Sequence, residues 1–237
     1  MGSFTESLRA ALTLISTWDA DLVSIALRSL QVSALACLLA VAGGVLLGAW
    51  LGVARFAGRA AVLACLNTLL ALPSVVVGLL VYVLLSRGGP LGHLGWLYSV
   101  KAMVIAQTIL VLPVVAALVR QMVEDADRAH GEQLASMGAG PWLRSVLLAW
   151  DERFALITIS ITAFGRAISE VGAVMMVGGN IEGFTRVMTT AIALETSKGD
   201  LPLAIGLGVV LLLIVLLLNA LIGLLKYWRE RVEAAAL

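Results

Sequence analysis

The sequence predicts an all-α polytopic membrane protein with about five membrane-spanning helices. Of the 237 residues, 61% are hydrophobic and only 13% are charged, whereas soluble domains are roughly half apolar and a quarter charged. The apolar residues gather into five long runs, and about 20 apolar residues in a helix cross a hydrocarbon core of roughly 30 Å. The formal net charge is only +1, so the charge balance does not indicate a nucleic-acid partner.

The apolar runs differ in their polar content. The first is rich in leucine, alanine and glycine, the second contains Pro73, and the third contains Gln107 and Pro113. The fifth is almost free of polar residues. Residues 1–25 are expected to form an amphipathic lead-in that is too polar to span. The expected spans are 29–54, 60–86, 101–119, 154–178 and 201–225, in a transmembrane domain at 26–222 that is followed by a tail at 223–237.

Lysine and arginine residues predict the orientation of these spans. If the C-terminus is cytoplasmic, the cytoplasmic pieces of the chain carry more lysine and arginine than the outer pieces. This bias favours an N-terminus outside and a C-terminus in the cytoplasm. The connection at 124–153 is then cytoplasmic.

The sequence EDADRAHGEQLASMGAGPWLRSVLLAWDER at 124–153 is expected to be folded. Residues 132–137 favour a short helix, and Gly138 is well placed to end it in a left-handed conformation. Pro141 suits the first turn of a second helix, where its missing N–H costs nothing. The expected structure is therefore a short helix, a sharp turn and a second helix that leads into the membrane.

One face of the expected short helix carries Leu134 and Met137, which are three residues apart. A short apolar face beyond the membrane needs a partner surface. It either packs beneath the helices of the same chain or forms a dock for a cytoplasmic protein, and the residues alone leave both interpretations open.

The fourth expected span contains Arg166 and Glu170, four residues apart, so their side chains can form an ion pair. A lone charge at the centre of a bilayer costs at least about 2.5–3.5 kcal/mol. The pair could be structural and fix the register of the helix, it could belong to a substrate path or gate, or both could hold. In the second case Arg166 attracts an oxyanion, and Glu170 neutralises the arginine when the path is empty.

Beyond this pair, Gly178-Gly179-Asn180 predicts a break in the helix near the outer side, because glycine permits the turn. Hydroxyl and guanidinium groups suit a tetrahedral dianion, which offers only hydrogen-bond acceptors. Helix packing explains the threonines equally well, and Arg186 could be a solvated charge or a contact for a binding protein. The candidate path or gate residues are Arg166, Glu170, Ser169, Asn180, Thr185, Arg186 and Thr189.

The sequence also lacks several kinds of site. It contains no phosphate-binding loop of the Gly-x-x-x-x-Gly-Lys-Ser/Thr type. His93 and His130 have no metal-ligand spacing, and no nucleophile lies in a pattern with a base. We therefore expect no catalytic residues, no metal site and no enzymatic activity in this chain alone.

The segment EQLASMGAG at 132–140 resembles the EAA-type loop of permease subunits of ABC importers with type I architecture. Glu132 and Gly138 stand six residues apart, as in that motif, and Leu134 replaces its second alanine. In the family this loop forms a coupling helix that sits in a cleft of the ATP-binding subunit. The resemblance implies a coupling role for Glu132, Leu134, Met137 and Gly138.

A second segment, FGRAISEVGAVMMVGGNIEGFTRVMTTAIALETSKGD at 164–200, is similar to the corresponding stretch of tungstate importer permeases. LPSVVVGLL at 72–80 also resembles this oxyanion group, and molybdate permeases share a looser form. The resemblance implies a type I permease fold and import of tungstate (WO4 2−) across a bacterial or archaeal plasma (inner) membrane. It also implies that ATP hydrolysis in another subunit drives transport.

The same resemblance implies a set of partners. A second copy forms a homodimer, and two ATP-binding subunits use ATP and magnesium, so this chain needs no cofactor. An extracytoplasmic substrate-binding protein delivers the anion, and lipid surrounds the spans.

Three alternatives stay open at this point. Molybdate or sulfate could be the cargo, and tungstate and molybdate share charge and shape. The chain could be a self-contained anion channel or secondary transporter, but such a protein would not need an exposed docking surface at Leu134 and Met137. A purely structural membrane subunit leaves Arg166 and Glu170 unexplained.

Overall fold

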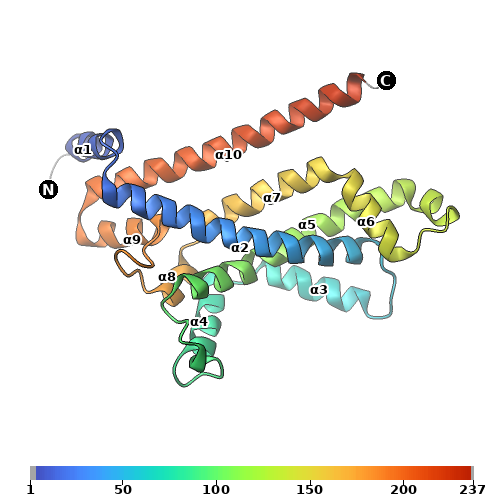
Figure 1. Cartoon of the computed structure of the whole chain (residues 1–237), viewed down its shortest axis with the longest axis horizontal. Coiled ribbons are helices and arrows are strands. Elements are labelled where there is room, and N and C mark those ends of the chain that lie inside the picture. Colours follow the sequence, from blue (N-terminus) through green and yellow to red (C-terminus); the bar gives the residue numbers. More distant parts are fainter. Residues whose placement is uncertain (1–3, 236–237) are drawn as a thin grey trace. The chain divides into compact units, whose positions relative to one another are not determined.

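The computed structural model describes residues 4–235 (Figure 1), which contain ten α-helices and one short 3-10 helix. Within these residues no strand is present, so the all-α prediction is confirmed. In chain order the elements are α1 (Phe4–Ser16), α2 (Ala20–Val53), α3 (Arg59–Leu70), α4 (Ser74–Leu85), η1 (Gly92–Leu94), α5 (Val100–Ser136), α6 (Pro141–Asp151), α7 (Arg153–Ile168), α8 (Gly172–Gly178), α9 (Met188–Lys198) and α10 (Leu201–Ala235).

Three helices are long and apolar enough to cross a membrane: α2, α5 and the Leu201–Leu225 part of α10. Two further candidates are bent pairs. α3 and α4 meet at 98°, and α7 and α8 meet at 58°. If each bent pair is one span, residues 4–235 contain five candidate spans, which agrees with the predicted number.

The sequence predicts the second span as one continuous helix, but the structure divides it into two. It breaks between Leu70 and Ser74. Pro73 lies at this break, where it lacks a backbone N–H and disfavours a helical conformation for the residue before it. The fourth expected span also contains a break that was not predicted, between Ile168 and Gly172.

Two other boundaries differ from the expected ones. α2 begins at Ala20, inside the expected lead-in, because the Asp19 carboxylate accepts hydrogen bonds from the N–H groups of Asp21 and Leu22 at 3.1 Å each. Such a cap satisfies backbone donors at a helix start. α5 continues to Ser136, so the expected separate helix at 132–137 is wrong: these residues form the end of α5 and the turn after it.

The described chain divides into two compact units. Unit 1 comprises Met1–Leu35, Pro73–Gln107 and Gly165–Asn219, and unit 2 comprises Ala36–Leu72, Thr108–Phe164 and Ala220–Leu237. The long helices α2, α5, α7 and α10 contribute residues to both units.

In unit 2, α2 and α5 pack closely through glycines spaced four residues apart. A Cβ atom on Gly48 would lie 2.5 Å from the Ala116 carbonyl oxygen, and one on Gly52 would lie 2.9 Å from Val123 Cβ. Small residues at this spacing let two membrane helices approach backbone to backbone. This contact holds the two helices that lead toward the 124–153 segment.

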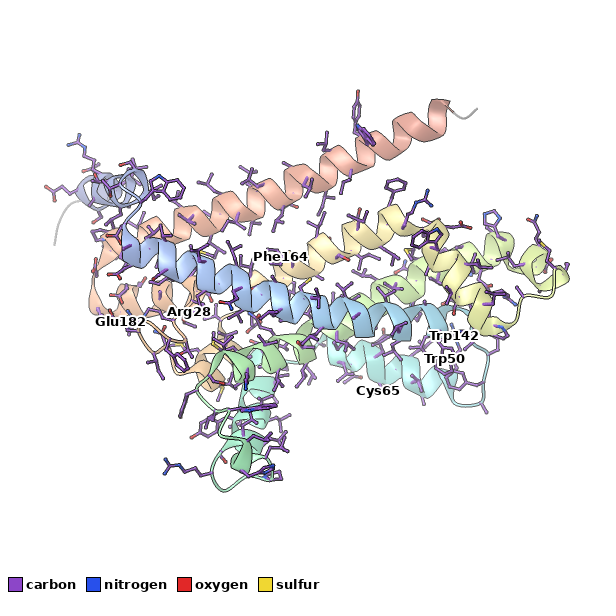
Figure 2. All side chains as sticks on the ribbon, in the orientation of Figure 1. Arg28, Trp50, Cys65, Trp142, Phe164 and Glu182 are labelled. Atoms are coloured by element: carbon purple, nitrogen blue, oxygen red, sulfur yellow. The ribbon has the colours of Figure 1, made fainter. Side chains whose placement is uncertain are left out.

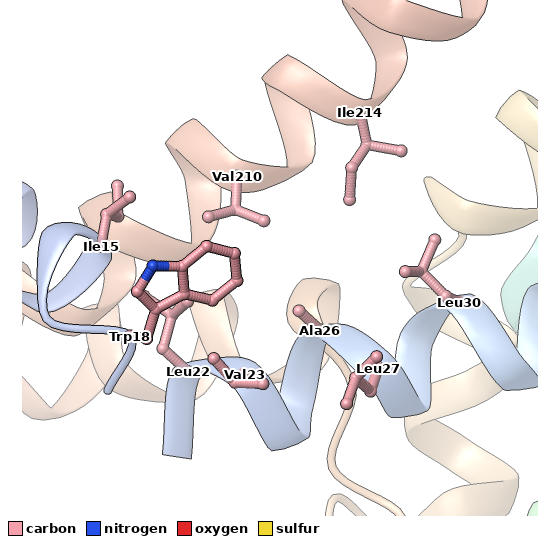
Figure 3. A pocket seen from close by; sticks show the side chains of 9 residues that line it. All are labelled: Ile15, Trp18, Leu22, Val23, Ala26, Leu27, Leu30, Val210 and Ile214. Carbon is pink, nitrogen blue, oxygen red and sulfur yellow. The ribbon is translucent and has the colours of Figure 1, made fainter. Parts of the chain in front are cut away.

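In unit 1, α4 packs against α8, and a Cβ atom on Gly78 would lie 2.8 Å from Ala173 Cα. The Ser29 hydroxyl of α2 accepts a hydrogen bond from the Met188 N–H at 2.6 Å, which holds the start of α9. An apolar cavity of about 280 Å³ lies beside α2 and α10 (Figure 3). It is lined by Ile15, Trp18, Leu22, Val23, Ala26, Leu27, Leu30, Val210 and Ile214.

Candidate functional site

The chain leaves the helical path at residues 169–171, between α7 and α8. The Glu170 N–H donates to the Ala167 carbonyl at 3.1 Å. The Glu170 carboxylate accepts a hydrogen bond from the Ala173 N–H at 3.3 Å, in the first turn of α8. The Thr189 hydroxyl donates to the Glu170 carbonyl at 2.7 Å. Glu170 therefore bonds to both sides of the break and connects it to α9.

Arg166 and Glu170 form the predicted ion pair. Arg166 Nη1 lies 3.0 Å from Glu170 Oε2. The two side chains differ in exposure, since 47% of the Arg166 side chain is exposed but only 5% of the Glu170 side chain. An anion can therefore approach the guanidinium group without reaching the carboxylate. Ser169 beside them is exposed, and its hydroxyl donates to the Gly165 carbonyl at 2.9 Å.

The predicted break after α8 is confirmed. Gly179 and Asn180 have φ angles of 70° and 50°, a region that glycine adopts freely and asparagine tolerates. The Asn180 amide donates to the Thr190 carbonyl at 3.3 Å and accepts a hydrogen bond from the Thr190 hydroxyl at 2.8 Å. Asn180 thus satisfies groups in the first turn of α9.

The candidate threonines use their hydroxyls within the protein. Thr185 and Thr189 are both buried. The Thr185 hydroxyl donates to the Gly178 carbonyl and accepts from the Ile181 N–H, and the Thr189 hydroxyl donates to Glu170. In this conformation both hydroxyl protons are engaged. Their contact with a substrate stays a prediction that requires these bonds to open.

Arg186 lies in a charged cluster in which only 12% of its side chain is exposed. Its guanidinium nitrogens lie 3.6 Å from a Glu182 oxygen and 3.8 Å from a Glu195 oxygen. Glu195 is buried and also pairs with Lys198 at 3.0 Å. These residues and Asp21 line a cavity of about 270 Å³. Arg186 is therefore not a freely solvated charge.

Sequence reasoning missed the roles of two polar residues in unit 1. Glu195 is the buried acid that pairs with Arg186, and its signal is a single carboxylate in the otherwise uncharged stretch VMTTAIALETS. Gln107 is buried in α5 and donates its amide N–H to the Ala167 carbonyl at 2.9 Å, one turn before the break. Its signal was a polar residue inside an apolar run.

Unit 1 also holds buried polar atoms that have no hydrogen-bond partner in the described part of the chain. They are Nη1 of Arg28, Oε1 of Gln107 and Nε of Arg186. Buried polar atoms without a partner are rare in native proteins. Two of the three are guanidinium nitrogens, which can only donate hydrogen bonds.

In unit 2, the predicted turn at Gly138 is confirmed. Gly138 has a φ of 85°, and the Ala139 N–H donates to the Leu134 carbonyl at 3.0 Å, which closes the end of α5. Pro141 is the first residue of α6, as predicted. Glu132 is exposed and Leu134 half-buried, whereas Met137 is 77% exposed. The predicted coupling residues are therefore accessible together at this turn.

A buried ion pair fixes the turn from inside. The Arg144 guanidinium group of α6 bonds to the Asp127 carboxylate of α5, with Nε at 3.2 Å from Oδ1. Asp127 is buried. The pair lies over Gly131, where a Cβ atom would come within 2.5 Å of the Asp127 carboxylate. Sequence reasoning did not identify this pair, because the two residues are far apart in the chain.

A second charged cluster surrounds Glu124, beyond the apolar part of α5. Its carboxylate pairs with Arg120, with Arg59 at 3.3 Å and with Arg128 at 3.2 Å. Burial raises the pKa of Glu124, but the Arg128 hydrogen bond and the charges of Arg59 and Arg120 outweigh it, so the pKa lies below its ordinary value. Arg59 also donates to the Leu51 carbonyl at 3.1 Å. The cluster ties α3 to α2 and α5.

Comparison with known proteins identifies the family of the chain. Residues 44–231 match the family described as binding-protein-dependent transport system inner membrane component. The chain belongs to this family. The tungstate uptake system permease of Peptoclostridium acidaminophilum is 40% identical over 222 residues, which cover 94% of this chain and 97% of that protein.

Two further relatives place the chain within the family. The tungstate uptake system permease of Campylobacter jejuni is 42% identical over 160 residues, or 68% of this chain and 67% of that protein. The molybdenum transport system permease of Escherichia coli is 30% identical over 185 residues, or 73% of this chain and 80% of that protein.

As a member of the family, the chain is a transport component of the inner membrane, and its apolar helices agree with a multi-pass membrane protein. Among the described residues, no group of three or more His, Cys, Asp or Glu side chains could hold a metal ion.

Proposed function

We propose that this chain is the permease subunit of an ABC importer that moves tungstate into the cell. The similarity to the Peptoclostridium acidaminophilum tungstate permease over 94% of the chain is the observation that carries this proposal. Two copies would form the path, two ATP-binding subunits would supply energy from ATP and magnesium, and an extracytoplasmic binding protein would deliver the anion. The N-terminus would lie outside and the C-terminus in the cytoplasm.

In this proposal the break at 169–171 is part of the path. Arg166 is half-exposed and attracts the dianion by charge-assisted hydrogen bonds. Glu170 holds Arg166 when no anion is present and keeps the anion from binding too tightly. Transport requires a site that is strong enough to admit an ion and weak enough to release it.

Molybdate is the second candidate cargo, since the Escherichia coli molybdenum permease is also similar. The test is uptake of tungstate and molybdate by cells that carry the transporter, with and without deletion of this chain, measured by elemental mass spectrometry. Loss of tungstate uptake alone supports the proposal. Loss of molybdate uptake alone, or no change, contradicts it.

The proposed orientation has a separate test. In a Cys37→Ser, Cys65→Ser background, Phe184→Cys should react with an impermeant thiol reagent in intact cells, because Phe184 is 53% exposed on the loop before α9. His130→Cys, which replaces an exposed residue near the coupling turn, should react only in opened cells. The reverse pattern would contradict the orientation.

A further inference from the structure

Helix α6 carries an exposed stripe made entirely of large apolar side chains. Trp142, Val146 and Trp150 follow one another at four-residue spacing, and Leu143 and Leu147 lie beside them, so the five share one side of the helix. Each is between 39% and 69% exposed. The opposite side of α6 packs inward through Ser145, Leu148 and Ala149. We call the five exposed residues the α6 stripe.

The stripe borders a groove of about 460 Å³ that lies against α2. Trp142, Val146 and Trp150 form one wall, and Val45, Leu46 and Ala49 of α2 form the other. The α2 wall belongs to a helix that is apolar enough to cross the membrane. Leu46 is 59% exposed, and Leu47 beside it is also exposed. The groove is therefore continuous with exposed apolar side chains of α2.

Aromatic residues mark the level of this groove relative to the bilayer. Trp50 lies near the end of α2 and Trp142 in the first turn of α6, and both side chains are labelled in Figure 2. Trp50, Trp142 and Trp150 are all exposed. Tryptophan concentrates at the boundary between the hydrocarbon core and the headgroups, so three exposed tryptophans favour a position of α6 at that boundary.

Two exposed arginines follow the helices that form the groove. Arg153 follows α6, is exposed, and lies next to the Trp150 carbonyl. Arg55 follows α2 and is exposed as well. Basic side chains beside an apolar face are typical of helices that lie in the membrane interface, where they meet lipid phosphates. Asp151, the last residue of α6, and Glu152 precede Arg153 and are acidic, so only the two arginines attract lipid phosphates.

We propose that α6 lies in the membrane interface on the side of the 124–153 segment, with the α6 stripe turned toward the acyl chains. The groove between α6 and α2 then binds one acyl chain of a phospholipid. This site fixes the coupling turn at a set depth through Arg144 and Asp127, which join α6 to α5. Only one part of this proposal rests on the proposed function: that the protein bound at the coupling turn is the ATP-binding subunit.

The experiment uses photocrosslinking in the assembled transporter in its native membrane. The photoreactive residue p-benzoylphenylalanine replaces Val146 on one wall of the groove or Leu46 on the other. After irradiation, the mass of the permease is measured. Adducts of one phospholipid mass at both positions are expected. An adduct with the ATP-binding subunit, an adduct with a second permease copy, or no adduct would each overturn the lipid site.

A second variant tests whether the stripe holds the lipid. With the photoreactive residue at 46, Val146→Asp should reduce the lipid adduct several-fold, because a carboxylate in the groove repels an acyl chain. Val146→Leu should leave the yield unchanged. Equal yields in the two variants would also overturn the proposal.

The photoreactive residue at Met137 separates this proposal from the proposed function. An adduct with the ATP-binding subunit is expected there. If it is missing while lipid adducts form at 146 and 46, the docking of that subunit at the turn is wrong and the lipid site stands.

Discussion

The break at 169–171 and the turn at Gly138 both interrupt a helix, but they are stabilised in opposite ways. At the break, buried Glu170 bonds to Arg166, to the Ala173 N–H and through its carbonyl to Thr189. At the turn, Gly138 makes the bend with a left-handed backbone conformation, and no atom of the described residues lies within 4 Å of where its Cβ would be. A charged side chain specifies the first, whereas backbone conformation specifies the second.

This difference matches what each region must do under the proposed function. A path for an anion needs charge at a defined position inside the membrane, and such charge requires partners. A docking turn needs free side chains, and Met137 and Glu132 are exposed there. Beneath the turn, the buried Asp127 carboxylate pairs with the partly buried Arg144.

The largest expected loss of stability comes from breaking the Asp127–Arg144 ion pair. Asp127→Ala should leave the Arg144 charge without a partner and lower the free energy of unfolding by about 3–5 kcal/mol, because a buried charge that loses its partner is costly. Asp125→Ala, at a carboxylate that is 60% exposed, should cost less than about 1 kcal/mol. Thermal unfolding of the purified permease in detergent measures both. Equal effects would show that the turn does not depend on the buried pair.

A smaller effect is expected at the turn itself. Gly138→Ala should cost about 1–2 kcal/mol, because an L-residue with positive φ is strained. No described atom lies within 4 Å of the added Cβ, so strain is the only cost. Gly140→Ala is the matched control, since Gly140 also has open space and a φ of −69°. We expect ATPase stimulation by substrate to fall in the first variant only. A loss in both variants would indicate contact with the partner and not backbone strain.

The smallest expected effect is at Thr189. Thr189→Val removes the hydroxyl that donates to the Glu170 carbonyl, a hydrogen bond that contributes about 1 kcal/mol. Thr189→Ser keeps the hydroxyl and should restore most of that stability. Thermal unfolding compares the two variants, and a Ser variant as unstable as the Val variant would place the effect in packing alone.

The two interruptions were not equally predictable from the sequence. Gly138 and Pro141 act through local conformational preference, so the end of α5 and the start of α6 could be located, although the length of α5 was not. The break at 169–171 contains no glycine or proline within Ser169-Glu170-Val171. It depends on contacts from distant residues, including Thr189 and the close approach of Gly172 to Ser74.

The candidate site shows the same division. The Arg166–Glu170 pair follows from four-residue spacing in one helix, and its ion pair was predictable. The role of Glu170 as a cap for α8 was not, because it requires a helix that begins after the break. The Asp127–Arg144 pair and the position of Glu195 likewise arise from packing between separate helices, which no local pattern encodes.

The most direct test of the account is tungstate uptake by the double variant Arg166→Met, Glu170→Leu. Both charges are removed together, so neither is left buried without a partner. The control is membrane insertion and copurification of the ATP-binding subunit, which should be normal. If the pair belongs to the path, uptake should fall at least about tenfold, because an apolar constriction offers a dianion no compensation for its lost hydration. Near-normal uptake would show that the pair only stabilises the helix break.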